Sequence, residues 1–167
     1  MKTLYLTRHA KSSWKNSELD DHDRPLNKRG TRDAPMMGDK LKAMGIYPDM
    51  LWSSTALRAK ITAQVLAQKL DISYSRIQWK REIYDSDADE LLDMIRNADD
   101  SEDSLMLFGH NPEFTWLANK LAGTHIENVP TSGIVGIVFE GETWANLSHG
   151  HGKLQFFIYP KLFKPKS

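Results

Sequence analysis

Residues 104–112 read Ser-Leu-Met-Leu-Phe-Gly-His-Asn-Pro, a stretch that joins a strand signal to a helix signal. The apolar run at its start is typical of a strand that is buried on both faces of a sheet. Asn111 favours the N-cap of a helix, Pro112 favours its first turn, and Gly123 favours its end. The stretch therefore predicts a buried strand that passes directly into a helix, with His110 at the junction.

The same order of strand and helix recurs along the chain. Strands are expected at 2–7, 50–52, 74–79, 104–108, 134–139 and 154–159, and helices at 28–44, 54–70, 86–98 and 112–122. This alternation predicts an α/β fold, a three-layer sandwich with a mostly parallel central sheet of about six strands and helices on both faces. No helix is expected between the last two strands, so at least one of them can pair antiparallel. Residues 10–27 are polar and predict a long loop, which in a compact domain is usually functional.

Length and composition narrow the class of protein. The 167 residues predict a single domain over 1–167. The absence of cysteine excludes a disulfide framework, a zinc–thiolate site and a cysteine nucleophile. The formal net charge is zero, which is not typical of a protein that binds nucleic acid. Because no apolar run approaches the ~20 residues that span a bilayer and no signal peptide is evident, we expect a cytoplasmic protein without nucleic-acid or membrane partners.

Polar side chains follow three of the predicted strands at the point where each strand ends. Arg8 and His9 follow the first strand, Arg58 lies at the start of the helix after the second strand, and His110 follows the apolar strand at 104–108. Ligands of open α/β sheets bind beyond the carboxyl ends of the strands. We therefore expect two arginines and two histidines to meet at one edge of the sheet.

Such a set of side chains suits a phosphoryl group. The guanidinium group of arginine carries a permanent charge and a planar fork that matches phosphate, and helix N-termini add backbone N–H groups. A neutral imidazole can attack phosphorus and form a covalent intermediate. The two arginines would stabilise the charge of the transition state, so the set predicts phosphoryl transfer without a metal or another cofactor.

The same residues belong to a longer pattern. In order, the chain contains Leu-Thr-Arg8-His9-Ala10-Lys11-Ser12, Ser53-Ser54-Thr55-Ala56-Leu57-Arg58-Ala59, Glu82 and Gly109-His110-Asn111-Pro112. This order of motifs resembles that of the histidine phosphatase superfamily, whose proteins are also called phosphoglycerate mutase-like. The sequence pattern of that superfamily begins with an Arg-His-Gly signature. The short length and Asp23-Arg24-Pro25-Leu26 before Gly30 resemble its SixA-type phosphohistidine phosphatases. Ala10 stands where the family usually has glycine, and the resemblance covers residues 4–139.

The resemblance implies roles for individual residues. His9 is the expected nucleophile that carries a phosphohistidine intermediate, His110 is the second catalytic histidine, and Arg8 and Arg58 bind the phosphate. Glu82 falls where larger members of the superfamily carry a proton-donating carboxylate, so it is a candidate proton donor. The alternative for Glu82 is a surface carboxylate that pairs with Lys80 or Arg81.

Other polar residues have two interpretations each. Arg24 is a candidate for binding substrate by closing over the phosphate, or it pairs with Asp20, Asp21 or Asp23. Ser12 is a candidate for donating a hydrogen bond to substrate, or it stabilises a turn. His149 and His151 form a His-x-His pair, but no third ligand is near in the sequence, so a solvated turn is expected and no metal site.

These observations predict a metal-independent phosphohydrolase that works through a phosphohistidine intermediate on His9 and dephosphorylates phosphohistidine on a protein. Two alternatives remain open. One is a phosphatase that acts on small phosphate monoesters by the same mechanism. The other is a non-catalytic module that binds phosphate or a phosphoprotein. In each case the expected partner carries phosphate.

Overall fold

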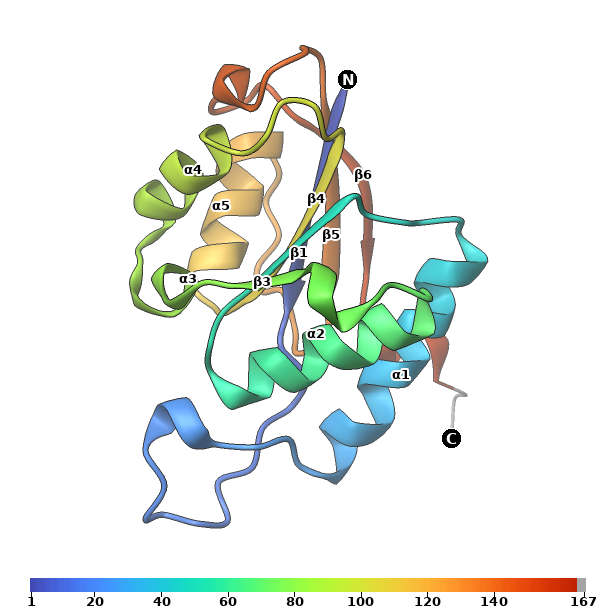
Figure 1. Cartoon of the computed structure of the whole chain (residues 1–167), viewed down its shortest axis with the longest axis vertical. Helices are drawn as coiled ribbons and strands as arrows, with labels where there is room; N and C mark the ends of the chain where they lie inside the picture. Colours follow the sequence, from blue (N-terminus) through green and yellow to red (C-terminus); the bar gives the residue numbers. More distant parts are fainter. Residues whose placement is uncertain (165–167) are drawn as a thin grey trace.

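A computed structural model describes residues 1–164 of the chain (Figure 1). Its strands are β1 (Lys2–Arg8), β2 (Met50–Ser53), β3 (Ile77–Trp79), β4 (Ser104–Gly109), β5 (Ile134–Phe139) and β6 (Lys153–Ile158). Its α-helices are α1 (Lys28–Ala43), α2 (Leu57–Lys69), α3 (Arg81–Asp85), α4 (Ala88–Arg96) and α5 (Glu113–Ala122). Four short 3-10 turns complete it: η1 (Asp21–Asp23), η2 (Tyr74–Arg76), η3 (Trp144–Asn146) and η4 (Pro160–Phe163). No helix in this part of the chain is long and apolar enough to cross a membrane.

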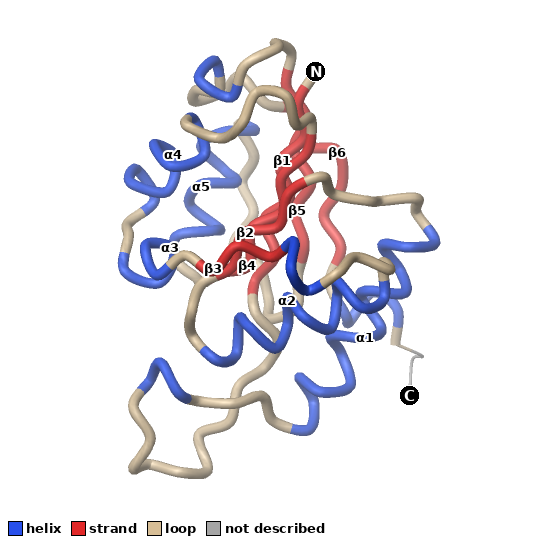
Figure 2. The backbone as a smooth tube through the Cα atoms, in the orientation of Figure 1, coloured by secondary structure: helices blue, strands red, loops and turns tan. Residues whose placement is uncertain are grey.

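The six strands form one sheet in the order β3-β2-β4-β1-β5-β6, drawn in red in Figure 2. β3, β2, β4 and β1 run parallel, whereas β5 pairs antiparallel with both β1 and β6. The prediction of a mostly parallel α/β sheet is therefore confirmed, and both pairings of β5 supply the antiparallel part. In the register, Arg8 lies beside Gly109 and Ser53 lies beside Phe108, so β1, β2 and β4 end at the same edge.

Helices cover both faces of the sheet, as predicted (Figure 1). Side chains alternate between the two faces along each strand. Leu6 and Leu107 pack into the core beneath α4 and α5, whereas Tyr5 and Phe108 pack into the core beneath α1 and α2. Because β1 and β4 are covered on both sides, their central residues are apolar: Leu4–Leu6 in β1 and Leu105–Phe108 in β4.

The region around β3 differs from the prediction. Only Ile77–Trp79 forms a strand, because Tyr74–Arg76 makes a 3-10 turn that Ser73 caps by accepting a hydrogen bond from the Ser75 amide. The five-residue helix α3 follows and was not expected. Helix α4 then begins at Ala88, later than expected, because Asp87 and Glu90 form a capping box. These changes place a short helix beside the carboxyl edge of the sheet.

The start of α5 also differs in detail. Pro112 occupies the N-cap position and the helix begins at Glu113. Asn111 still stabilises this end, because its side-chain oxygen accepts hydrogen bonds from the backbone and hydroxyl of Thr115 at 3.2 and 2.9 Å. His110 therefore sits on a short, rigid connection between β4 and α5.

The loop between β1 and α1 is folded back on itself. Ser12 and Leu26 form an isolated β-bridge, and the Asn27 amide donates to the Lys11 carbonyl at 2.9 Å. A Cβ at Gly30 would overlap the carbonyl oxygen of Lys11, so glycine is required where α1 packs against the loop. The loop is thereby fixed beyond the carboxyl edge of the sheet.

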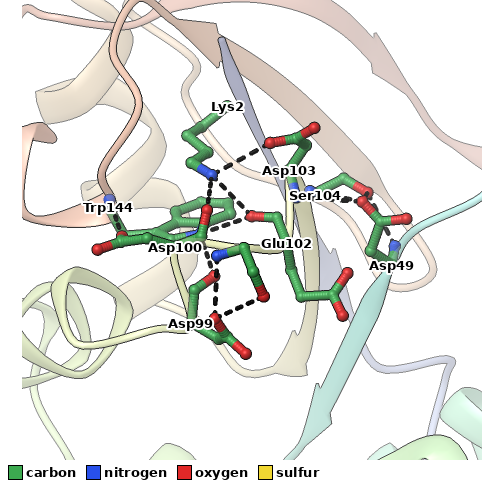
Figure 3. Close-up of polar contacts among 9 residues, drawn as sticks. Lys2, Asp49, Asp99, Asp100, Glu102, Asp103, Ser104 and Trp144 are labelled. Carbon is green, nitrogen blue, oxygen red and sulfur yellow. Dashed lines mark hydrogen bonds and ion pairs between the residues drawn. The ribbon is translucent and has the colours of Figure 1, made fainter.

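A polar network lies at the opposite, amino edge of the sheet (Figure 3). We call it the Lys2 cluster; it consists of Lys2, Asp49, Asp99, Asp100, Glu102, Asp103, Ser104 and Trp144. The buried Lys2 amine donates to the carbonyls of Asp100 and Glu102 at 2.6 and 3.0 Å and to the Asp103 carboxylate at 3.1 Å. The indole of Trp144 donates to the same Glu102 carbonyl at 3.0 Å. The cluster thus satisfies a buried cation at the start of β1.

Candidate active site

His9 lies immediately after β1 and is 7% exposed. Its backbone amide donates to the Gly109 carbonyl, and its Nδ1 lies 2.7 Å from the Ala10 carbonyl oxygen. A carbonyl oxygen only accepts hydrogen bonds, so Nδ1 carries the proton and Nε2 carries the lone pair. This is the tautomer that a nucleophilic histidine needs.

The surroundings of His9 keep its imidazole neutral. Burial lowers its pKa most, the contact with the Ala10 carbonyl raises it in part, and the positive charges of Arg58, Arg8 and Arg24 lower it further, to about 3. At neutral pH the ring therefore has its lone pair available for attack on phosphorus.

His110 faces His9 from the end of β4. Their ring centroids are 5.3 Å apart, and His110 Nε2 lies 2.8 Å from the hydroxyl oxygen of Ser54. Burial lowers the pKa of His110 to about 3, assisted by His9 and Arg58. Two neutral imidazoles thus lie side by side at the carboxyl edge.

Each of the two arginines is held through part of its guanidinium group. Arg8 Nη1 donates to the Val129 carbonyl at 2.9 Å, and Arg58 donates through Nη1 and Nη2 to the backbone oxygen and carboxylate of Asp21 at 2.7 and 2.9 Å. Burial and the neighbouring charge of Arg58 lower the pKa of Arg8. Like charges are therefore concentrated where a bound anion would relieve their repulsion.

Several buried polar atoms around His9 have no hydrogen-bond partner within residues 1–164. They are Arg8 Nε, Arg58 Nε, His110 Nδ1 and Ser132 Oγ. Ser132 belongs to the same site because its amide donates to the carbonyls of Arg8 and His9, with a backbone φ of 62°. Buried donors are normally paired. Nitrogen and hydroxyl donors from four segments of the chain therefore suit an anionic group at His9.

Three residues at the rim of this site were not predicted as site residues from the sequence: His22, Tyr84 and Asp21, which was considered only as a partner of Arg24. The Tyr84 hydroxyl donates to Asp21 Oδ2 at 2.8 Å, and the Tyr84 ring stands edge-on to the rings of His22 and His110, with centroids 4.8 and 5.5 Å away. His22 Nε2 lies 2.8 Å from Thr55 Oγ1. These contacts join the loop before α1 to the segment just before α2 and to α3.

Arg24 and Ser12 bond to each other. Arg24 Nη1 donates to Ser12 Oγ at 2.9 Å, and Arg24 Nε donates to Asp21 at 3.1 Å. The guanidinium group also stacks on Trp14, 3.5 Å from the ring centroid. Of the carboxylates considered from the sequence, Asp21 is therefore the one that pairs with Arg24. Arg24 still acts on the site, because its charge contributes to the lowered pKa of His9.

Glu82 is not brought to His9. It is exposed in the first turn of α3 and lines a surface hollow with Trp52 and Lys80, and neither Lys80 nor Arg81 forms an ion pair with it within residues 1–164. Residues two positions apart on a helix lie about 200° apart around its axis, so Tyr84 takes the site-facing side of α3. A catalytic role for Glu82 stays a prediction.

His149 and His151 lie in a turn remote from these contacts. His149 packs edge-on against Trp116, and His151 Nδ1 donates to the Asn146 carbonyl at 2.8 Å. No group of three or more histidine, aspartate or glutamate side chains arranged to hold a metal ion occurs in the described part of the chain.

Comparisons with known proteins identify the family of this chain. Residues 4–102 match the histidine phosphatase superfamily (branch 1). An uncharacterized protein of Mycobacterium tuberculosis is 32% identical over 164 residues, which cover 92% of this chain and 99% of that protein. An uncharacterized chloroplastic protein of Arabidopsis thaliana is 32% identical over 132 residues, which cover 74% of this chain but 61% of that protein.

Solved structures have the same fold. The SixA protein of Agrobacterium tumefaciens superimposes with a TM-score of 0.80 at 27% identity, over 95% of this chain and 98% of that one. The protein histidine phosphatase SixA in complex with tungstate superimposes with a TM-score of 0.82 at 19% identity, over 97% of this chain and 99% of that one. The chain therefore belongs to the histidine phosphatase superfamily (branch 1) and is a phosphatase with a SixA-like fold.

Proposed function

We propose that this phosphatase dephosphorylates phosphohistidine on a protein through a phosphohistidine intermediate on His9. The observation that carries the proposal is the state of His9: Nδ1 is committed to the Ala10 carbonyl, the ring is neutral, and unpartnered buried donors of Arg8, Arg58 and His110 surround it. An imidazole lone pair next to donors for phosphoryl oxygens suits in-line attack on phosphorus.

The proposed reaction has two steps at phosphorus. His9 Nε2 attacks, the Nε2–P bond forms, and the bond from phosphorus to the substrate ring breaks. The substrate nitrogen keeps the electron pair, and the ring leaves as neutral imidazole because its other nitrogen carries a proton. Arg8, Arg58 and His110 donate hydrogen bonds to the phosphoryl oxygens and stabilise the transition state. Water then attacks phospho-His9, the P–Nε2 bond breaks, and inorganic phosphate and a proton leave.

The acids near the site favour a nitrogen leaving group. Hydrogen bonds from Tyr84, Arg58 and Arg24 outweigh the effect of burial on Asp21 and lower its pKa to about 2, so Asp21 is ionised at neutral pH. Glu82 lies in a different hollow. An alkoxide leaving group needs a proton donor more than an imidazole does. An ionised Asp21 and a Glu82 that lines a separate surface hollow are therefore better suited to phosphohistidine than to alkyl phosphates.

The test compares a phosphohistidine protein with a panel of phosphate monoesters at matched concentration. Wild-type protein should turn over phosphohistidine faster and accumulate an acid-labile phosphate label. His9→Ala should abolish turnover and labelling, whereas the matched variant of an exposed histidine, His125→Ala, should retain both.

Each contrary result has a specific meaning. An active His9→Ala variant would exclude the proposed intermediate. Faster hydrolysis of monoesters would replace the proposed substrate by a small phosphate ester. Tight phosphate binding without turnover of any substrate would indicate a binding module instead.

A further inference from the structure

The loop between β1 and α1 places one carboxylate, Asp21, on the cationic groups of the site. Asp21 Oδ2 accepts from Arg58 Nη2 at 2.9 Å and from the Tyr84 hydroxyl at 2.8 Å, while Oδ1 accepts from Arg24 Nε at 3.1 Å. Its backbone oxygen accepts from Arg58 Nη1 at 2.7 Å. Asp21 thus bonds to three side chains that come from the loop itself, α2 and α3.

These bonds hold Arg58 in one orientation. The guanidinium group has two edges that can bind an oxyanion in a bidentate manner. Asp21 occupies the edge formed by Nη1 and Nη2, and the buried Nε on the other edge has no partner within residues 1–164. The edge that remains is therefore the one available to a phosphoryl oxygen.

The ionisation states of Asp21 and Tyr84 support a fixed arrangement of these hydrogen bonds. The pKa of Asp21 is lowered to about 2, so its carboxylate accepts all three hydrogen bonds at neutral pH. Burial and the contact with Asp21 raise the pKa of Tyr84, so its hydroxyl remains a donor. Charge-assisted hydrogen bonds of this kind are short and directional, which suits positioning.

The neighbouring acidic residues lack this set of bonds. Asp20 and Asp23 flank Asp21 in or next to the same 3-10 turn. The Asp20 side chain caps no backbone amide of the turn, and Asp23 lies 3.8 Å from His22 Nδ1. Both are exposed, so they provide matched controls for the loss of one negative charge.

We propose that Asp21 is a positioning residue for phosphoryl transfer: it orients Arg58 and Arg24 toward the phosphoryl group and fastens the loop to α3 through Tyr84. The proposal rests on the proposed phosphoryl-transfer site but not on the identity of the leaving group, because Arg58 would contact the phosphoryl oxygens of any substrate.

The first test measures kcat, KM and inhibition by tungstate for Asp21→Asn, Asp20→Asn and Asp23→Asn. When a group that stabilises the transition state is displaced by about 1 Å, the rate falls by up to about a hundredfold. We expect Asp21→Asn to lose about tenfold to a hundredfold in kcat/KM and to bind tungstate more weakly, with both controls within about twofold of wild type. Equal effects of the three variants would overturn the proposal, because they would reflect net charge.

The second test separates positioning from a general loss of structure. Residues that act through one another show non-additive effects. In an Arg58→Ala background, Asp21→Asn should cost at least about threefold less than it does in the wild-type protein, because only its contacts with Arg24 and Tyr84 remain to be lost. An undiminished loss in that background would overturn the proposal, as would a gain in activity of Asp21→Asn on phosphate esters that carry a second anionic group, since Asp21 would then act by repelling substrate.

The two proposals fail in different ways. If the wild-type protein hydrolyses only small monoesters, the proposed substrate is wrong, and the same Asp21 comparison is made with that ester. If tungstate binding and kcat/KM are unchanged in Asp21→Asn, the positioning role is wrong whatever the substrate.

Discussion

Lys2 and Arg8 lie at the two ends of β1, and their cationic groups are paired differently. The Lys2 amine has three acceptors within 3.1 Å, so the Lys2 cluster is complete without a ligand. At the other end, the buried Nε atoms of Arg8 and Arg58 have no partner within residues 1–164. Both regions combine burial with charge, but only the second leaves donors unused. The comparison predicts that the unused donors at the Arg8 end bind a ligand, whereas the fully paired Lys2 amine stabilises the fold.

The largest expected effect is a loss of activity when an arginine near the Arg8 end of β1 is replaced. Arg58→Ala removes a donor that we propose contacts the phosphoryl group, and loss of one such donor costs about 10²–10³ in rate. Kinetics on the preferred substrate would measure it, with denaturant unfolding as a parallel readout. A loss of activity below tenfold would show that the unpartnered Nε is not used in the transition state, and the comparison would fail.

A second prediction concerns how the free energy of unfolding depends on pH through His9 and His110, which lie at the Arg8 end of β1. The unfolded chain protonates histidine below about pH 6.5, whereas burial lowers the pKa of both His9 and His110 to about 3 in the folded protein. Their contribution to stability is neutral above pH 6.5 and becomes unfavourable as pH falls toward 3. We expect the free energy of unfolding to fall by about 1 kcal/mol per pH unit for each histidine in this range.

Urea unfolding between pH 7 and 4.5 would measure this dependence. His9→Gln and His110→Gln should each reduce the slope, whereas His125→Gln, at an exposed position, should not. Asp21, with a pKa of about 2, keeps its stabilising ion pairs throughout this range. A wild-type slope that is unchanged in both variants would show that the two rings are not held neutral by the fold.

The fold and the floor of the site could be predicted from the sequence for a common physical reason. Apolar runs fix which segments are buried strands, and parallel pairing brings their carboxyl ends to one edge. Arg8, His9 and His110 follow directly from that rule, as the register of Arg8 with Gly109 shows. Membership of the histidine phosphatase superfamily was likewise expected from the order of motifs and is confirmed.

The rim could not be predicted in the same way. Asp21 and His22 lie in a polar loop without periodicity, so nothing local indicates which of several aspartates turns toward Arg58. Helix α3 has five residues, which is too short for an apolar repeat. For this reason the sequence pointed to Glu82, whereas the structure turns Tyr84, two residues further on, toward the site. Which of the three carboxylates pairs with Arg24 is likewise set by the path of the loop.

The smallest expected effect is a loss of stability when Lys2, whose amine is fully hydrogen-bonded, is replaced. Lys2→Met keeps the apolar stem but removes the amine, so the Asp100 carbonyl loses the donor of its part-buried hydrogen bond. The Glu102 carbonyl still accepts from Trp144, and the Asp103 carboxylate, 78% exposed, turns to water. Leaving a buried acceptor unpaired costs about 1–3 kcal/mol, so we expect a loss of about 2 kcal/mol in unfolding free energy with unchanged kcat/KM. The control is Lys42→Met, whose exposed ion pair with Asp71 should be worth less than about 1 kcal/mol. If Lys2→Met impaired catalysis as strongly as Arg58→Ala does, a cation with all its hydrogen bonds formed would also determine activity. The number of unused donors would then not distinguish the two ends of β1.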